Sequence, residues 1–378
     1  MGNSKPNSSH FITKPDALLE LASLLGRQKI VGVDTESNSL FAYQEQVCLV
    51  QFSTIEEDYL VDPLALADLS PLADLFANPR IEKVFHAAEY DLICLRRDFG
   101  FSFANLFDTM LAGRILGFKE VGLGSMLETF YGVQADKRQQ RANWGQRPLT
   151  QPLLEYAMLD THYLISLRDR LEAELDAAGL LPLAQEDFRR LCLAEPNSTE
   201  ETREPFWRIS GAHDLSPQQA AVLKELSRYR DQVALQLDRP LFKVIGNQTL
   251  IALAQACPPD LEALRGLPGM SPHQIHKHGP ALLEAVQRGL AAQPIHPPRT
   301  PRPDEHYLSR LEALREWRKL KGRELEVESD VVLPRDLLYR LAAEDPRQPA
   351  QLQQVLHDSP WRMEHFGSQI LAVLSKKH

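Results

Sequence analysis

The sequence has 378 residues, of which 43% are hydrophobic and 25% are charged, a composition that is ordinary for globular proteins with room for two or three domains. The net charge of −9 argues against a surface coated in nucleic acid, but it permits a local basic groove. No apolar run approaches the roughly 18 residues that span a bilayer, and the N-terminus lacks the apolar core of a signal peptide. The four cysteines form no CxxC pair. We therefore expect a cytoplasmic protein without a membrane partner.

The first part of the chain mixes strand and helix patterns. Apolar, β-branched runs predict strands at 29–36, 46–54, 58–62, 83–87 and near 106–108. Apolar residues at helical spacing predict helices at 15–26, 66–77, 88–98, 108–117 and 151–179. The first three strands are close enough to pair as a meander, and strands and helices then alternate. This order indicates an α/β domain, in which helices flank a mixed sheet.

Two segments without periodicity are predicted to be linkers. The first, 195–204, is polar and acidic, and the second, 293–304, is dense in proline. Together with a predicted disordered tail at 1–10, they divide the chain into domains at 11–194, 205–292 and 305–378.

The second and third domains are predicted to be all-helical, and their sequences resemble each other at a constant offset of 88 residues. LKELSRYR at 223–230 matches LEALREWR at 311–318, and HGPALLEAV at 278–286 matches FGSQILAVL at 366–374. We interpret this offset as a duplicated small helical domain. The alternative is two unrelated amphipathic bundles.

Carboxylates occur at three places, each of which also has an ordinary explanation. Asp34 and Glu36 project from the same face of a predicted strand, where they repel each other unless a cation lies between them; a solvated strand edge is the alternative. Asp91 lies in the first turns of a predicted helix, where an acid also suits the helix dipole. Tyr156 and Asp160 share one face of a helix that can otherwise be ordinary. Together they offer four oxygen ligands for hard cations, with a tyrosine beside the last.

Along the chain these motifs are a DxE on a strand, an Asp at the start of a helix and a YxxxD within a helix. In this order they resemble the motifs of the DEDD superfamily of 3′–5′ exonucleases, in the branch that has tyrosine in the third motif. The similarity to the ribonuclease D family is close. It is carried by DTESNSL (34–40), VCLVQFS (47–53), KVFHAAEYDL (83–92), LFDT (106–109) and KRQQRANWGQRPLT (137–150). The helical repeats resemble the paired HRDC domains of that family. The resemblance implies an RNase H-like α/β exonuclease domain followed by two all-α HRDC-like domains.

The resemblance also implies a set of catalytic residues. Asp34, Glu36, Asp91 and Asp160 would bind two divalent ions, Mg²⁺ or Mn²⁺, which hold the attacking and leaving oxygens of an in-line displacement. Tyr156 would orient the attacking water rather than act as a base, because an unperturbed tyrosine titrates near pH 10. The implied product is a nucleoside 5′-monophosphate released from the 3′ end.

A basic run ahead of YAMLD (156–160) is the candidate for substrate contact beyond the metals, because cations hold backbone phosphates and an aromatic ring stacks on a base. A solvated basic loop is the alternative. The candidates in this run are Lys137, Arg138, Arg141, Trp144 and Arg147. Two candidates for substrate contact lie outside this run, His86 and Leu40. For His86 the alternatives are a metal ligand and a hydrogen-bonding core residue, and Leu40 either stacks on the terminal base or packs in the core.

The expected function is the trimming of structured RNA, above all the 3′ ends of transfer RNA precursors, by a monomer. A DNA exonuclease of the same superfamily is the alternative within catalysis, because metals contact phosphate and only 2′-hydroxyl contacts tell RNA from DNA. An inactive RNA-binding adaptor would be expected to lack one of the carboxylates. A helical interaction platform would leave these carboxylates unexplained.

Overall fold

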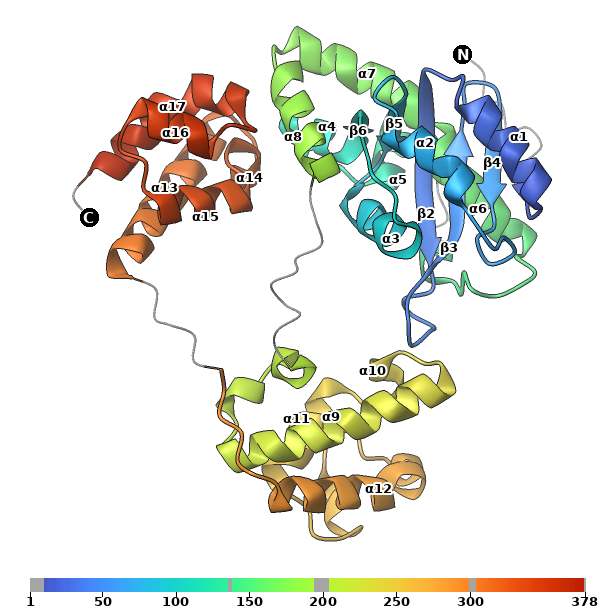
Figure 1. Ribbon diagram of the computed structural model, residues 1–378, viewed down its shortest axis with the longest axis vertical. Coiled ribbons are helices and arrows are strands. Elements are labelled where there is room, and N and C mark those ends of the chain that lie inside the picture. The colour runs from blue at the N-terminus through green and yellow to red at the C-terminus, as the bar shows by residue number, and fades with distance from the viewer. Residues whose placement is uncertain (1–9, 135–137, 194–203, 299–303, 377–378) are drawn as a thin grey trace. The chain divides into compact units, whose positions relative to one another are not determined.

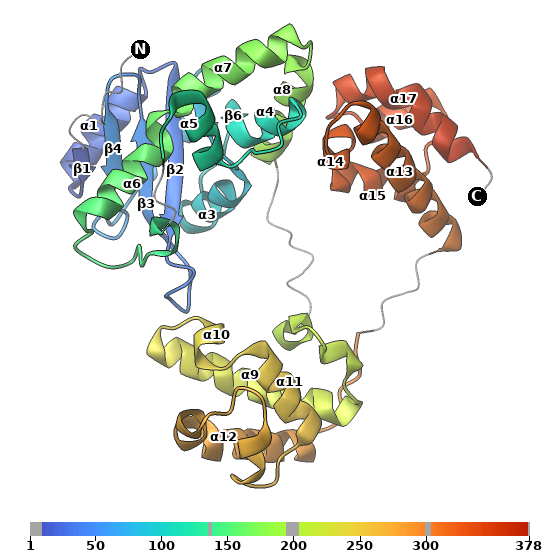
Figure 2. The same cartoon turned by 180° about the vertical axis from the view of Figure 1, so that it is seen from behind.

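The computed structural model describes residues 10–134, 138–193, 204–298 and 304–376, whose main elements are labelled in Figures 1 and 2. The chain divides into two compact units. The first comprises residues 1–37, 47–195 and 302–378, and the second comprises residues 38–46 and 196–301. Within the described ranges, no helix has the length and apolar character needed to cross a membrane. Apart from His10 and Glu204, the predicted tail and first linker lie outside the described residues.

The first unit contains a mixed sheet of six strands, in the order β1-β4-β3-β2-β5-β6. The strands are β1 (His10–Ile12), β2 (Ile30–Ser37), β3 (Val47–Ser53), β4 (Asp58–Val61), β5 (Glu82–Phe85) and β6 (Leu106–Asp108). Strands β2, β3 and β4 form the predicted antiparallel meander, and β5 and β6 extend the sheet in parallel with β2. The five predicted strands and the mixed sheet are thus confirmed. Strand β1, which was not predicted, pairs in parallel with β4 at the edge.

Eight α-helices of the described chain belong to the exonuclease-like domain. They are α1 (Pro15–Leu25), α2 (Ala73–Ala77), α3 (Glu89–Phe99), α4 (Thr109–Ile115), α5 (Leu123–Tyr131), α6 (Gln151–His162), α7 (Leu164–Ala177) and α8 (Leu181–Leu193). The helix predicted at 151–179 is wrong as one element, because the chain breaks at Tyr163, whose ring stacks on Tyr131 of α5. Helices α5 and α8 were not predicted, and only the last part of 66–77 is α-helical.

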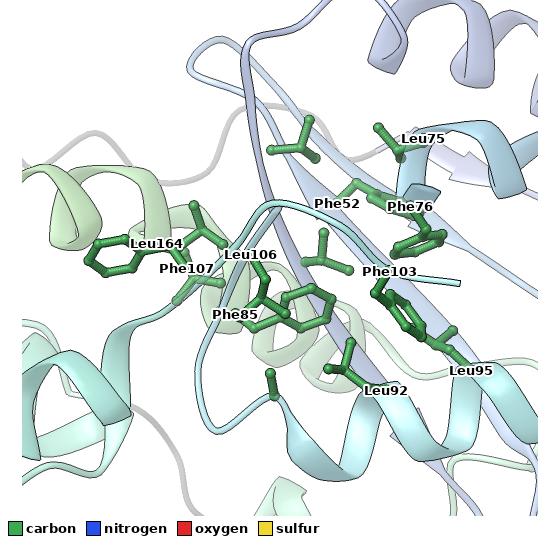
Figure 3. Packing of buried hydrophobic residues seen from close by; sticks show 14 of the residues in the cluster. Phe52, Leu75, Phe76, Phe85, Leu92, Leu95, Phe103, Leu106, Phe107 and Leu164 are labelled. Atoms are coloured by element: carbon green, nitrogen blue, oxygen red, sulfur yellow. The ribbon is translucent and has the colours of Figure 1, made fainter. Parts of the chain in front are cut away.

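Both faces of the sheet are covered by helices. Helices α1, α2 and α3 lie on one face, and α6 and α7 lie on the opposite face (Figures 1 and 2). On the first face, Phe76 packs against Phe52 and Phe103, with ring centroids 6.1 and 5.5 Å away (Figure 3). On the second, Leu164 begins the apolar stripe of α7. A sheet buried on both sides explains why its strands read as continuous apolar runs.

The helices of the two repeats correspond at the same offset, except that a short 3-10 helix, Ala263–Gly266, stands in the first repeat where the second has an α-helix. The first contains α9 (Pro217–Leu237), α10 (Leu241–Val244), α11 (Asn247–Ala256) and α12 (Pro272–Ala291). The second contains α13 (Glu305–Glu324), α14 (Ser329–Val332), α15 (Arg335–Glu344), α16 (Pro349–Val355) and α17 (Pro360–Ser375). Arg230 donates to the Ile245 carbonyl at 3.1 Å, and Arg318 donates to the Leu333 carbonyl at 2.9 Å. Because both positions of this bond recur 88 residues later, the predicted duplication is confirmed.

Within the second unit, the segment Asn38–Gln46 contacts the first repeat. The Tyr43 hydroxyl donates to Asp231 at 2.8 Å, and its backbone N–H donates to Asp238 at 3.0 Å. The segment therefore belongs with 196–301, although it follows β2 directly in the sequence.

Within the first unit, the second repeat packs on α8 through buried charges. Arg362 of α17 is fully buried, and its guanidinium donates to Glu186 and, at 2.7 and 2.8 Å, to the two carboxylate oxygens of Asp187. It also donates to the carbonyls of Val331 and Val332. The buried acids and the buried cation neutralise one another only while the two domains are packed together.

We predict that Arg362→Met weakens this packing, because it leaves two buried carboxylates without their cation. The loss of one partner from a buried ion pair costs about 3–5 kcal/mol, measurable as a lower free energy of unfolding in urea. Replacing all three residues, with Arg362→Met, Glu186→Leu and Asp187→Leu, should recover most of the loss. Arg265→Met, at an exposed ion pair with Glu262, is the matched control and should change stability little. An equal effect of both single variants would contradict the role given to Arg362.

Candidate active site

Three of the predicted metal ligands converge at the end of β2. Asp34 and Glu36 are carried by β2, and Asp160 is carried by α6. Each of the three offers a carboxylate oxygen, and these oxygens all lie within 4.8 Å of one another. Three hard oxygen donors at this spacing fit a divalent cation such as Mg²⁺ or Mn²⁺.

The convergence depends on a close approach between β2 and α6. A β-carbon at Gly32 would lie only 3.1 Å from the Thr161 carbonyl, so that a larger residue would push the helix away. A buried polar network holds the same helix end. The Ser53 hydroxyl is 2.6 Å from both Asp58 and the Thr161 hydroxyl, and His162 is 2.8 Å from Asp58. These contacts place Asp160, the residue before Thr161, beside Asp34.

The carboxylates of the site disfavour one another's ionisation. Burial raises the pKa of Asp34, and the charges of Asp91, Asp160 and Glu36 raise it further. Burial also raises the pKa of Glu36, with Asp160 and Asp91 adding to the effect. For Asp91 and Asp160, burial raises the pKa from 3.8 to about 7. Such a site is destabilised when all of its acids are ionised at neutral pH, and a bound cation would remove that cost.

The fourth predicted ligand, Asp91, lies near this group but is held separately. It is buried in the first turn of α3, and its carboxylate accepts a hydrogen bond from the Thr35 hydroxyl. The Thr35 backbone N–H also donates to it. Thr35 lies between Asp34 and Glu36 on β2, so this strand end carries two of the acids and orients a third.

Tyr156 lies directly against the carboxylates. Its hydroxyl is hydrogen-bonded to Asp160 and to the side chain of Gln140. Burial raises the pKa of Tyr156 well above its usual range, and the charges of Asp160, Glu36 and Asp34 add to the effect. A phenol in this setting keeps its proton, which suits a residue that orients another group by hydrogen bonding.

A cavity of about 360 Å³ opens beside the carboxylates. Its lining includes Asp34, Tyr156, Asp160, His86 and Gln140, together with the first turn of α5. The structure therefore brings His86 into the same cavity as three of the predicted catalytic residues, Asp34, Tyr156 and Asp160. Gln51 lies opposite Asp34 on the neighbouring strand; it is fully buried, and its amide has no hydrogen-bond partner in the described chain.

The basic run does not form one substrate-binding surface. Trp144 is 1% exposed and packs in a core cluster, with its ring centroid 6.2 Å from that of Tyr156. The prediction that it stacks on a base is therefore wrong, because the ring has no free face. Its contact supports Tyr156 from behind instead.

Arg147 is likewise wrong as a substrate contact. Its Nε and Nη2 donate to the two carboxylate oxygens of Asp62 at 2.7 and 2.6 Å. Its remaining N–H groups donate to the carbonyls of Cys48, Trp144 and Gln146. All five donors of the guanidinium are thus used within the protein, and none is left for a phosphate.

The other predicted substrate contacts stay predictions. Arg138 and Arg141 are exposed. Lys137 lies outside the described residues. Leu40 is 41% exposed and belongs to the segment grouped with the second unit.

Three polar residues near the site were not singled out from the sequence. They are Thr35, Gln51 and Gln140. Thr35 had a visible signal, since it stands inside DTE, but its partner Asp91 is 56 residues away. The contacts of the other two depend on strand register and on the path of the loop before α6, which local sequence patterns do not reveal.

Comparison with family models finds the same organisation. A model described as 3′-5′ exonuclease matches residues 9–176, and a model described as HRDC domain matches residues 219–286 and 308–374. The exonuclease match contains all of the carboxylates of the site. The repeated match agrees with the duplication seen in the two helical repeats.

Individual proteins are similar over different shares of their length. Ribonuclease D of Nitrobacter hamburgensis is 31% identical over 96% of this chain and 94% of its own. The exosome complex exonuclease RRP6 of Saccharomyces cerevisiae is 31% identical over 73% of this chain. The matched region covers only 40% of that longer protein. The crystal structure of Escherichia coli RNase D, described as an exoribonuclease involved in structured RNA processing, superposes with a TM-score of 0.68 at 27% identity. It covers 98% of this chain and 99% of its own.

We predict that the metal-free protein loses stability as pH rises from about 4 to about 7. The folded-state pKa of Asp91 and of Asp160 is raised from 3.8 to about 7. In this window the folded state therefore holds protons that the unfolded chain has released, and stability must fall with rising pH. Thermal melting in EDTA measures the fall. Asp160→Asn should make the fall shallower, because Asp91 still titrates, and millimolar Mn²⁺ should abolish it. An identical pH profile with and without Mn²⁺ would contradict the assignment of a cation to these acids.

We predict that Thr35→Val raises the divalent-ion concentration needed for half-maximal activity about tenfold, the usual scale for losing a hydrogen bond to a metal ligand. Valine keeps the β-branched shape that suits a strand, so the fold should persist. Thr35→Ser keeps the hydroxyl and is the matched control, expected to behave like the wild type. If the valine and serine variants need the same ion concentration, Thr35 does not position Asp91 for the metal.

Proposed function

This chain belongs to the ribonuclease D family, and from that membership we propose that it is a 3′–5′ exoribonuclease that trims the 3′ ends of structured RNA, including transfer RNA precursors. The observation that carries the proposal is the convergence of Asp34, Glu36 and Asp160 within 4.8 Å, beside a cavity that Tyr156 also lines. The family depends on divalent metal ions, and the donor set of the site consists of the hard oxygens that such ions prefer.

The proposed metal site uses Asp34, Glu36, Asp91 and Asp160 for two divalent ions, either Mg²⁺ or Mn²⁺. When bound, such ions supply charge stabilisation to the attacking and leaving oxygens of phosphodiester hydrolysis. Tyr156 orients the attacking water through its hydroxyl, because its raised pKa keeps the phenol protonated. The proposed products are nucleoside 5′-monophosphates.

Substrate contact outside the metals is proposed for Arg138 and Arg141, with Lys137 as a third cation, since the described two are exposed in the segment just before α6. Leu40 is proposed to meet the terminal base. We further propose that the protein acts as a cytoplasmic monomer. The structured substrate is supported by the E. coli relative, whose description names structured RNA processing.

A cleavage assay tests the proposal with 3′-extended transfer RNA and matched single-stranded DNA, each with Mg²⁺, Mn²⁺ or EDTA. We expect a ladder from the RNA 3′ end that depends on the metal, with DNA little changed. A ladder from DNA alone would favour a DNA exonuclease. Binding of RNA without cleavage under any metal would favour an inactive adaptor.

The variant Asp34→Asn should abolish cleavage and leave RNA binding largely intact, because it removes one metal ligand at nearly constant shape. Asp74→Asn, at an exposed acid of α2, is the matched control and should cleave like the wild type. If Asp34→Asn retains activity, Asp34 does not belong to the metal site.

A further inference from the structure

His86 lies in the catalytic cavity without a part in the chemistry described so far. It follows β5 and lines the cavity with Asp34, Tyr156 and Asp160. Among the described residues, the close group of possible metal ligands contains Asp34, Glu36 and Asp160 but not His86. A histidine in this position needs a role other than holding the metal with that group.

The hydrogen bonds of Thr109 determine where the imidazole carries its proton. The Thr109 hydroxyl lies 3.1 Å from the Phe85 carbonyl and 2.9 Å from Nδ1 of His86. A hydroxyl has one proton, and a carbonyl oxygen can only accept, so the Thr109 proton points to Phe85. The remaining contact is a hydrogen bond only if Nδ1 of His86 is the donor.

Burial also favours a neutral ring, and a neutral ring with its proton on Nδ1 has none on Nε2. Burial lowers the pKa of His86, against an opposing effect from Asp108. Thr109 is fully buried, so the Nδ1 edge of the ring faces the protein interior. The edge with Nε2 is the one that remains for the cavity, where it presents a lone pair.

The backbone around His86 is held firmly in this position. Ala87 adopts a left-handed conformation with φ of 63°, which is costly for a residue with a side chain. Asp108 stabilises this backbone conformation, because its carboxylate accepts hydrogen bonds from the N–H groups of Ala87 and Ala88 at 3.2 and 2.8 Å. The same carboxylate caps α4 through the N–H of Leu111. Ring orientation and backbone position are thus set before any substrate binds.

A lone pair in this cavity selects for a hydrogen-bond donor. Phosphate oxygens only accept, and the donors of the bases differ from one nucleotide to the next. The hydroxyls of ribose are donors that every nucleotide at an RNA 3′ end shares. We propose that Nε2 of His86 accepts a hydrogen bond from a ribose hydroxyl of the 3′-terminal nucleotide. This assignment rests on the proposed exoribonuclease function and gives that function a sugar-reading residue.

The test compares three RNA oligonucleotides that differ only in the last sugar: ribose, 2′-deoxyribose and 3′-deoxyribose. For the wild type, removal of the hydroxyl that His86 contacts should lower kcat/KM about tenfold, the usual scale for one hydrogen bond. The deoxy position with the loss identifies the hydroxyl. If no wild-type cleavage occurs on any oligonucleotide, the proposed function fails, and that result differs from a failure of the sugar-reading role alone.

Two variants of similar shape distinguish the roles of the two ring nitrogens. His86→Asn keeps a donor near the position of Nδ1 and removes Nε2. The ratio of kcat/KM between the oligonucleotides with and without the contacted hydroxyl should therefore fall from about ten to about one. His86→Gln keeps an oxygen acceptor near the position of Nε2, so part of the preference should remain. An unchanged preference in His86→Asn would overturn the proposal. The proposal would also be overturned if His86→Asn needed more Mn²⁺ than the wild type by the same factor on all three oligonucleotides, because His86 would then be a metal ligand.

A second measurement examines the proton without using activity. In the full chain labelled with ¹⁵N-histidine, two-bond ¹H–¹⁵N correlations should show the Nδ1–H form for the signal that is missing in His86→Asn. Thr109→Val should release this preference, since valine cannot accept the Nδ1 proton. Because Thr109→Val should shift the same signal, it identifies His86 even if the His86 variants fail to fold. An Nε2–H form of that signal in the wild type would contradict the proposal.

Discussion

The candidate site depends on how closely α6 approaches β2. The absence of a side chain at Gly32 leaves room for the Thr161 carbonyl, which would lie only 3.1 Å from a β-carbon at that position. This close approach brings the acids of two distant segments together. The approach is unfavourable on electrostatic grounds alone, because the charges of Asp91 and Asp160 raise the pKa of both Asp34 and Glu36. It persists because Ser53, Asp58 and His162 anchor the helix end through hydrogen bonds that are buried or partly buried. The protein holds a repulsive cluster in place, and the relief of that repulsion favours cation binding.

Around this cluster, most polar side chains serve to hold other groups in position. Thr35 orients Asp91, Asp108 fixes the turn at His86, and Arg147 directs all five donors to the protein itself. Trp144 fills the space behind Tyr156. Catalytic side chains must be held at defined positions, and neighbours that are tightly packed or fully hydrogen-bonded hold them there. Trp144 and Arg147, chosen as substrate contacts for their ring and charge, therefore turned out to be structural.

The two helical repeats show how one scaffold takes on different contacts. Both keep the arginine that bonds to a carbonyl between their helices, at Arg230 and Arg318. Only the second repeat belongs to the same compact unit as the exonuclease-like domain, through the buried charges of Arg362. At the corresponding position, 88 residues earlier, the first repeat has Gln274, a neutral amide that cannot supply such a charge.

Much of the architecture could be predicted from the sequence, because it follows from local periodicity. Strands buried on both faces appear as short apolar runs, which is why five of the six strands were predicted, and the duplication was visible as a constant offset. Strand β1 was missed because only three residues pair at the sheet edge. The break at Tyr163 was missed because the helical spacing continues through it, whereas its ring packs against Tyr131, a contact that the local sequence does not reveal.

For the site, the sequence by itself determined which acids and which tyrosine are available, and the family resemblance related them to one another. Tertiary structure alone decided their neighbours. Whether Trp144 faces a base or the core, and whether Arg147 faces phosphate or Asp62, depends on contacts with strands far away in the chain. The proton on His86 is likewise decided by Thr109, which is distant in sequence. Charge and residue type are local properties of a sequence, whereas burial and hydrogen-bond partners arise only when the chain is packed.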